Sequence, residues 1–279
     1  MWREFSLKMD FYSKWFFDKV YKNMKLGFIS DIHEDIKRLK QALSILKSFK
    51  CDKIICLGDI VGYSIPYYDF LSSRNSPEVI ELLRKKCDIA IAGNHDLFAI
   101  KKLPKYKAKF KYPKNWYGLN YWQRKSFAKD RIWLYEDNEL SALLTKEDKN
   151  FIDKLPEFFV GNFGGVRIFL SHYAYPDLVG ATKFEPKTIK DVKEHFEFMQ
   201  KFNCKFGISG HDHKEGIMRF TINKVDSLGF GKVKIDKNIP TWIHIPSIAK
   251  GSFVNGVAVF DTESFVIELI PLSQKEVRF

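Results

Sequence analysis

Five short polar clusters hold most of the side chains of this 279-residue sequence that could do chemistry. They contain five of the seven histidines, together with carboxylates and one asparagine. The clusters are Asp31-Ile32-His33, Gly58-Asp59, Gly93-Asn94-His95-Asp96, His172 and Gly210-His211-Asp212-His213. Imidazole, carboxylate and amide groups without a thiolate suit Mn, Fe, Zn, Co or Ni ions. The sequence therefore predicts a metal centre built from nitrogen and oxygen ligands.

Each cluster ends a short apolar run that is typical of a β-strand. Because ligands bind at the carboxyl ends of strands in open α/β sheets, we expect the five clusters to converge on one site. The two remaining histidines do not follow any of these apolar runs. We expect His195 on a helix surface and His244 within a strand. The predicted strands that precede the clusters are 25–30, 53–57, 87–93, 166–172 and 205–209.

The spacing inside two clusters predicts paired ligands. In extended backbone, residues i and i+2 face the same side, so Asp31 with His33, and His211 with His213, can each reach one cavity. A glycine directly precedes three of the clustered polar residues, where a missing side chain allows a sharp turn or a close approach. These glycines are Gly58, Gly93 and Gly210.

The elements around the clusters alternate between strand and helix patterns. Apolar residues at steps of three and four predict a helix over 35–49. Strand, helix and strand in succession predict a parallel sheet, so we expect one α/β domain over 24–279 after an N-terminal extension, 1–23. A break in the rhythm predicts a cap inserted at about 97–155. Further helices are predicted at 77–86, 145–155 and 191–202, and tail strands at 218–222, 241–245, 256–260 and 265–270.

The charge is concentrated in one part of the cap. The chain has 46 Lys and Arg against 34 Asp and Glu, a net charge of +12, and residues 101–131 hold 11 of these bases with one acid. Eight aromatic residues are interleaved there, which favours either a nucleic-acid partner or a solvated lysine face over a small aromatic core. No apolar run approaches the roughly 18 residues of a membrane span, and four cysteines without a CxxC pair indicate thiols in a reducing, cytoplasmic setting.

In this order, the five clusters resemble the motifs DxH, GDxxG, GNHD, a lone His and GHxH of the calcineurin-like metallophosphoesterase family. All five are complete here. The run Gly58-Asp59-Ile60-Val61-Gly62 lacks the arginine of the protein serine/threonine phosphatases, and the sequence looks more like the small bacterial and archaeal phosphodiesterase-type branch. The resemblance implies a four-layer αββα fold, a β-sandwich flanked by helices.

The resemblance also implies two divalent ions, with Mn²⁺ as the first choice, and a role for each motif residue. One ion would be held by Asp31, His33 and His213, and the other by Asn94, His172 and His211. Asp59 would bridge both ions, and His95 would act on the substrate, stabilising the transition state or protonating the leaving oxygen. Asp96 and Asp212 would orient histidines from behind the ligands.

Three functions follow from this resemblance as alternatives. The first is a phosphoesterase that hydrolyses a small anionic phosphodiester or phosphomonoester, including a nucleotide, by attack of a hydroxide that bridges the two ions. The second is a nuclease or nucleic-acid-binding phosphodiesterase that grips its substrate through residues 101–131. The third is a non-catalytic scaffold on the same fold, which the complete ligand set disfavours.

Overall fold

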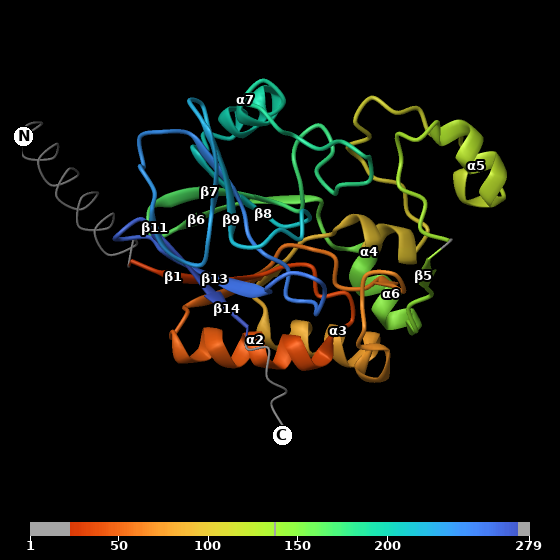
Figure 1. Cartoon of the computed structure of the whole chain (residues 1–279), viewed down its shortest axis with the longest axis horizontal. Helices are drawn as coiled ribbons and strands as arrows, with labels where there is room; N and C mark the ends of the chain where they lie inside the picture. Colours follow the sequence, from red (N-terminus) through yellow and green to blue (C-terminus); the bar gives the residue numbers. More distant parts are fainter. Residues whose placement is uncertain (1–22, 137, 273–279) are drawn as a thin grey trace, which may run out of the picture.

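Two six-stranded β-sheets form the centre of the protein (Figure 1). The computed structural model describes residues 23–136 and 138–272, so the predicted N-terminal extension lies outside them except for its last residue. The first sheet has the order β11 (Gly231–Lys234), β14 (Val266–Pro271), β13 (Gly256–Asp261), β1 (Lys25–Ile29), β2 (Lys53–Cys56), β4 (Ile89–Ala90). The second has the order β10 (Val225–Leu228), β9 (Ile217–Thr221), β12 (Thr241–His244), β8 (Phe206–Ser209), β7 (Val166–Ser171), β6 (Phe158–Phe163).

Each sheet contains three adjacent parallel strands, and its other pairs are antiparallel. The parallel strands are β1, β2 and β4 in the first sheet, and β7, β8 and β12 in the second. The prediction of a parallel sheet is therefore right for these strands and incomplete for the whole. Short connections, such as the turn between β13 and β14, allow only antiparallel pairing. Both sheets are mixed for this reason.

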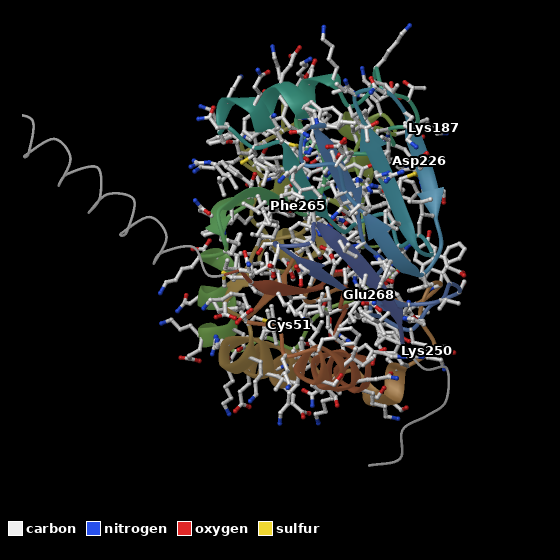
Figure 2. All side chains as sticks on the ribbon, turned by 90° about the vertical axis from the view of Figure 1, so that its left-hand side faces the viewer. Cys51, Lys187, Asp226, Lys250, Phe265 and Glu268 are labelled. Atoms are coloured by element: carbon white, nitrogen blue, oxygen red, sulfur yellow. The ribbon has the colours of Figure 1, made fainter. Side chains whose placement is uncertain are left out.

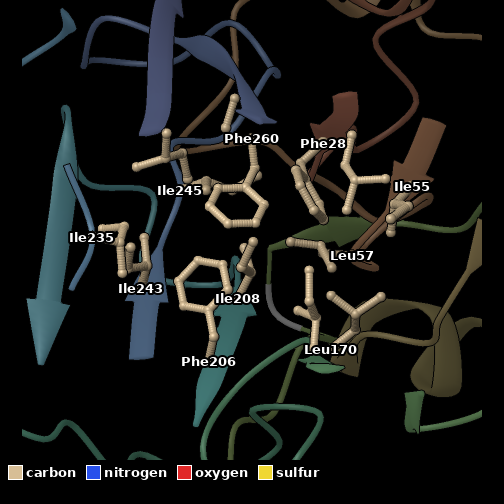
Figure 3. Close-up of a cluster of buried hydrophobic side chains, with 14 of the residues drawn as sticks. Phe28, Ile55, Leu57, Leu170, Phe206, Ile208, Ile235, Ile243, Ile245 and Phe260 are labelled. Carbon is tan, nitrogen blue, oxygen red and sulfur yellow. The ribbon is translucent and has the colours of Figure 1, made fainter. Parts of the chain in front are cut away.

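Three apolar layers separate four layers of secondary structure, which confirms the predicted αββα sandwich. The sheets pack face to face through Phe28, Leu170, Phe206 and Phe260 among others (Figure 3). Helices α2 (Ile36–Ser48) and α3 (Ser76–Lys86) cover the outer face of the first sheet, and α7 (Lys193–Lys201) covers the second. Figure 2 shows these helical layers at opposite sides of the two sheets.

Side-chain caps fix the starts of three of the four helices that the sequence predicts, and α7 begins without one. Asp35 accepts a hydrogen bond from the Arg38 N–H at the start of α2, and Asn75 does the same for the Glu78 N–H at α3. Thr145 and Asp148 form a reciprocal capping box on α6 (Lys146–Asp153). The polar residues before each apolar stripe are therefore the physical start signals of these helices.

The cap segment, residues 97–155, begins within α4 (Asn94–Ala99) and encloses a small aromatic core. Phe110 and Trp116 are buried together with Ala128 and Ile132, around the 3₁₀ helix η2 (Trp116–Gly118) and α5 (Tyr121–Ala128). A local aromatic core therefore lies within the lysine-rich stretch, as one of the two alternatives expects. β5 (Glu139–Leu140) ties the segment to β3 (Tyr63–Ser64), which η1 (Leu71–Ser73) follows. At its end, α6 packs with the helical layer of α2 and α3.

The four cysteines form no disulfide in this fold. Cys56 and Cys204 are buried, whereas Cys51 and Cys87 are half-buried. Burial raises the pKa of Cys87 to about 12 and that of Cys51 to about 11, so both thiols stay protonated at neutral pH. Separately, no helix among the described residues has both the length and the apolar character to cross a membrane.

His195 is fully buried, so the expectation of a helix-surface position is wrong. Its ring Nδ1 accepts a hydrogen bond of 2.9 Å from the Tyr175 N–H, and the ring lies 4.5 Å from that of Trp242. Helix α7 turns this residue toward the second sheet, where aromatic packing outweighs the polarity of the imidazole. Burial, with a smaller effect from His244, lowers the pKa of His195 to about 3.

We expect acid to destabilise the protein through this histidine. The unfolded chain binds a proton at His195 near pH 6.5 and the folded chain only near 3, so stability is present above 6.5 and falls between these values. The slope is at most about 1.4 kcal/mol per pH unit for one such group. Urea unfolding at pH 7.5, 6 and 5 measures it, and the loss should be smaller in His195→Gln. Equal losses in both proteins would contradict the assignment.

Candidate metal centre

The five polar clusters converge at the carboxyl ends of the parallel strands, as predicted. In the first sheet, β1 leads into Asp31 and His33, β2 leads into Asp59, and β4 leads into Asn94. β7 and β8 lead into His172, and into His211 and His213. The two sets come from opposite sheets, so the site lies where the ends of the two sheets meet.

Within this site, ligand atoms gather into groups in which all atoms lie within 4.8 Å of one another. The groups are Asp31, His33, His213; Asp59, His172, His211; and His33, Asp59, His95. Asp59 Oδ2 lies 3.1 Å from His172 Nε2 and 3.8 Å from His33 Nε2. Its carboxylate therefore stands between the first two groups, where it can reach both.

The rings of two histidines are held so that one nitrogen stays free for a ligand. His33 Nδ1 lies 2.7 Å from the Gly62 carbonyl oxygen, and His172 Nδ1 lies 2.7 Å from that of Leu57. These bonds place the proton on Nδ1 and leave Nε2 as the electron-pair donor. The buried Asp31 Oδ1 accepts no hydrogen bond of good geometry, although His213 Nε2 lies 3.1 Å away.

The contacts of Asn94 also fit a cation. One atom of its amide lies 2.7 Å from the Tyr135 hydroxyl. The other lies 2.9 Å from the Val179 carbonyl oxygen, 3.2 Å from both His172 Nε2 and His211 Nδ1, and 3.3 Å from Asp59 Oδ2. As a nitrogen this atom can donate to the Val179 carbonyl, and as an oxygen it can bind a cation that His172, His211 and Asp59 share. The donor set thus fits divalent ions.

The electrostatics of the site point the same way. Burial lowers the pKa of His33 to about 3, and it lowers that of His211 to about 3. Burial also lowers the pKa of His172, but Asp59 and Asp31 outweigh it and raise the value to about 10. Burial favours a neutral Asp59, yet His172 and His95 hold its pKa below the usual range. His33 and His211 are thus held as neutral imidazoles beside the Asp59 carboxylate, the protonation states that metal ligands need. The raised pKa of His172 shows that Asp59 and Asp31 favour a positive charge next to them.

The backbone at these ligands is not extended, which corrects the premise of the spacing argument. Asp31 and His33 have φ of 54° and 46°, and His211 and His213 have φ of 74° and 51°. The residues at i and i+2 do share a cavity, but tight left-handed turns aim them there. Non-glycine residues rarely adopt this conformation, and such strain is concentrated at functional sites.

The model of the calcineurin-like phosphoesterase family matches residues 24–215. The chain belongs to that family. Its match spans all five clusters and ends just beyond His213, so the family assignment rests on the same residues as the site. The protein is accordingly a metal-dependent phosphoesterase.

This phosphoesterase is similar to one curated relative in sequence and to solved structures in fold. An uncharacterized protein of Methanocaldococcus jannaschii, MJ0912, is 24% identical over 258 residues, which cover 88% of this chain and 86% of the relative. A metallophosphoesterase from Sphaerobacter thermophilus superposes with a TM-score of 0.61 at 18% identity, covering 90% of this chain and 89% of the other. The hypothetical protein PH1004 from Pyrococcus horikoshii gives 0.56 at 15% identity, with coverage of 90% and 89%.

His95 of the phosphoesterase sits beside the ligand groups and contacts the cap. Its N–H donates to Asp59 Oδ1 at 2.9 Å, and its ring Nδ1 is hydrogen-bonded to Glu139 of β5. The Tyr135 ring lies 4.6 Å away. Burial lowers the pKa of His95, but the Glu139 and Asp59 carboxylates outweigh it and raise the value to about 9. The cap therefore supplies the carboxylate that faces this histidine.

Sequence reasoning missed Glu139 and Tyr135. Neither residue belongs to a motif with a fixed distance from the clusters, and both reach the site through the folding of the cap segment. The sequence carries no motif that would have named either residue.

The roles expected of Asp96 and Asp212 need correction. Asp96 accepts hydrogen bonds from three backbone N–H groups, those of Ile60, Val61 and Gly93, and so fixes two ligand-bearing loops instead of a histidine. Asp212 is hydrogen-bonded to His244, which stands in β12 as expected, and not to a member of the ligand groups. Both carboxylates support the site through the backbone or through a neighbouring strand.

A cavity of about 350 Å³ opens above the groups of candidate metal ligands in the phosphoesterase. Asp59, Asn94, His95, His211 and His213 form its floor. Its wall includes residues 133–135 and Asn138 from the cap. No residue of 101–131 lines it. Residues of the basic aromatic stretch instead line a smaller neighbouring hollow, which shares Asn94 and Tyr135 with this cavity.

Gly93 is required by a close approach, and we expect Gly93→Ala to disrupt the centre. A Cβ at this position would lie 2.1 Å from Asp59 Oδ1 and 2.5 Å from the Asp59 backbone nitrogen. Overpacking of this kind costs about 1–3 kcal/mol, and the displaced carboxylate should bind metal more weakly. Urea unfolding and metal calorimetry measure both effects. The matched control is Gly118→Ala, where the nearest atom lies 3.8 Å away; an equal effect there would contradict the argument.

Proposed function

We propose that this phosphoesterase uses two divalent ions to hydrolyse a small phosphodiester or phosphomonoester. One ion would be held by Asp31, His33 and His213. The other ion would be held by Asn94, His172 and His211, and Asp59 would contact both ions. The observation that carries the proposal is the position of Asp59 Oδ2 between the two ligand groups. Mn²⁺ is the first choice among Mn, Fe, Zn, Co and Ni, on the family resemblance.

The chain's own residues supply proton transfer and orientation. Bound divalent ions would polarise the phosphoryl oxygens and lower the pKa of water. His95 Nε2 lies 4.0 Å from Asp59 Oδ2, so the ring presents this nitrogen to the ligand groups. Because Glu139 holds Nδ1, a proton on Nε2 can pass to the leaving oxygen. The surrounding Tyr135 and His33 rings fix the plane of His95.

The direct test is turnover of a chromogenic phosphodiester and monoester by protein stripped of metal and then given Mn²⁺, Zn²⁺ or Mg²⁺. We expect activity that depends on the added ion and saturates near two ions per chain. Activity unaffected by chelation would contradict the proposal. Metal bound without turnover of any ester in a broad panel would favour the scaffold alternative.

Glu139 acts as a positioning residue, and we expect Glu139→Gln to lower kcat by about tenfold to a hundredfold. The amide cannot hold the imidazolium in the same way, while metal binding should persist. The change should add little in a His95→Ala background, since both act through one proton transfer. Steady-state kinetics of the single and double variants measure this.

A matched control for that experiment is Glu136→Gln. Its carboxylate lies three residues earlier in the cap and pairs with Arg124 at 2.5 Å. This exchange should leave kcat unchanged. Equal loss in both variants would mean that any disturbance of the cap slows the reaction, and it would contradict the role of Glu139.

A nucleic-acid substrate gripped by residues 101–131 has less support. Trp122 and Phe127 are exposed there, but none of these residues lines the cavity. Binding that weakens steeply with salt, and collapses when the cap lysines are neutralised, would revive this alternative. We also propose a cytoplasmic location, supported by the four unpaired thiols.

A further inference from the structure

The cavity above the metal groups has an unusual lining for so basic a protein. Most of the side chains in its walls are either aromatic or uncharged and polar. The aromatic residues are Tyr67, Tyr68, Trp133, Tyr135 and Phe253, and the uncharged polar residues are Ser64, Asn138, Ser247, Ser252 and Asn255. A mainly apolar hollow with a few convergent polar groups is the usual form of a small-molecule site.

The aromatic wall continues from the metal groups to the surface. At its inner end, the Tyr68 ring lies 5.0 Å from that of His33 and the Tyr135 ring 4.6 Å from that of His95. At its outer end, Tyr67, Trp133 and Phe253 are 66%, 42% and 56% exposed. Aromatic rings left in contact with water around a hollow are typical of a surface that a ligand covers. A group attached to a phosphate at the metal centre would therefore lie along these rings.

No lysine or arginine lines the described part of this cavity, although the chain has 46 of these residues. Two lysines next to lining residues are engaged in ion pairs. Lys183 lies 5.1 Å from the Trp133 ring but pairs with Asp130, and Lys250 pairs with Asp69 at 3.1 Å. A second phosphate along these walls would thus lack a lysine or arginine partner, and burying an unpaired charge is costly.

We infer that this cavity is the subsite for the ester group of the substrate, and that this group is uncharged, planar and of nucleoside size. The substrate class is then a phosphodiester with a single negative charge, which the metal centre alone must bind. Polyphosphates and long nucleic acids are excluded, because both would bring further charges to walls without cations. This inference rests on the proposed function and names its substrate class.

Two esters that share a leaving group and a charge test the inference. They are the p-nitrophenyl ester of thymidine 5′-monophosphate and ethyl p-nitrophenyl phosphate, assayed with Mn²⁺. Stacking on aromatic side chains should raise kcat/KM for the thymidine ester about 10- to 100-fold over the ethyl ester. Trp133→Ala and Phe253→Ala should each lower this ratio several-fold. A thymidine ester with an added 3′-phosphate should react more slowly than the parent.

The matched control is Trp122→Ala, which removes an indole 72% exposed on α5 and outside the cavity. It should leave the ratio unchanged. Turnover of both esters with a ratio near one, or preference for the 3′-phosphorylated ester, would overturn the subsite while the proposed function stands. Failure to hydrolyse either ester with any metal would instead contradict the proposed function itself.

Discussion

Replacing His95 by alanine is expected to lower kcat by about 10²- to 10⁴-fold, the usual contribution of a general acid. The ring is nearly enclosed by the cap and by His33, so no other described side chain can take its place over the ligand groups. The loss should be greatest for alkyl leaving groups, which need a proton, and smallest for nitrophenolate, which does not. A series of diesters with graded leaving groups measures this dependence.

Metal binding must be measured on the same variant. His95 shares one of the ligand groups with His33 and Asp59, so it has access to a cation as well as to substrate. Two ions per chain in His95→Ala would assign the lost activity to proton transfer. Loss of one ion, with an equal rate loss for all leaving groups, would instead make His95 a ligand.

Asp59→Asn is expected to lower the affinity for metal by at least about 100-fold, because even residues that only support a ligand account for 10- to 100-fold. The amide keeps the shape of the side chain but loses the charge that lies between His33 and His172. In the wild type, Mn²⁺ at 100 times its Kd should stabilise the fold by about 2.7 kcal/mol. Thermal unfolding with and without Mn²⁺ should show a clear rise in Tm that this variant lacks.

Asp226→Asn provides the matched control for that experiment. It makes the same chemical change on β10, where the carboxylate pairs with Arg219 far from the ligand groups. Its Tm should rise with Mn²⁺ as in the wild type. An Asp59→Asn protein that still binds two ions with wild-type affinity would contradict the bridging role.

The strands and helices that the sequence predicts are those with a clear apolar signal. The helix at 36–48 and the strands at 25–29 and 206–209 combine apolar runs with polar ends, and all three are present. Among the strands that were missed, Phe158–Phe163 begins with an apolar run, but others lack such a signal. The segment Gly231–Lys234 reads GKVK, and β3 and β5 have two residues each. These form because a neighbouring strand offers them hydrogen bonds, which is a tertiary effect.

The residues of the candidate site also fall into those that the sequence predicts and those that depend on tertiary structure. The clusters at Asp31, Asp59 and His211 were predictable because strand, turn and ligand are contiguous in the chain. Glu139 was not, because its position depends on how the cap segment folds back over the core. The left-handed turns could not be predicted either. Asp31 and His33 have positive φ, but neither is a glycine, the residue type that would indicate such a conformation.

The short ribbon of β3 and β5 fixes the entrance of the site. Ser64 pairs with Glu139, the Ile65 N–H donates to the Asn138 carbonyl, and Arg74 donates to the carbonyl of Ser141 at 2.5 Å. The wall formed by residues 133–135 and Asn138 is therefore attached to the loop that follows Asp59, and it cannot move away without breaking these bonds. A rigid entrance of this kind selects ligands by their width. Bulky esters should therefore be excluded sterically, however reactive they are.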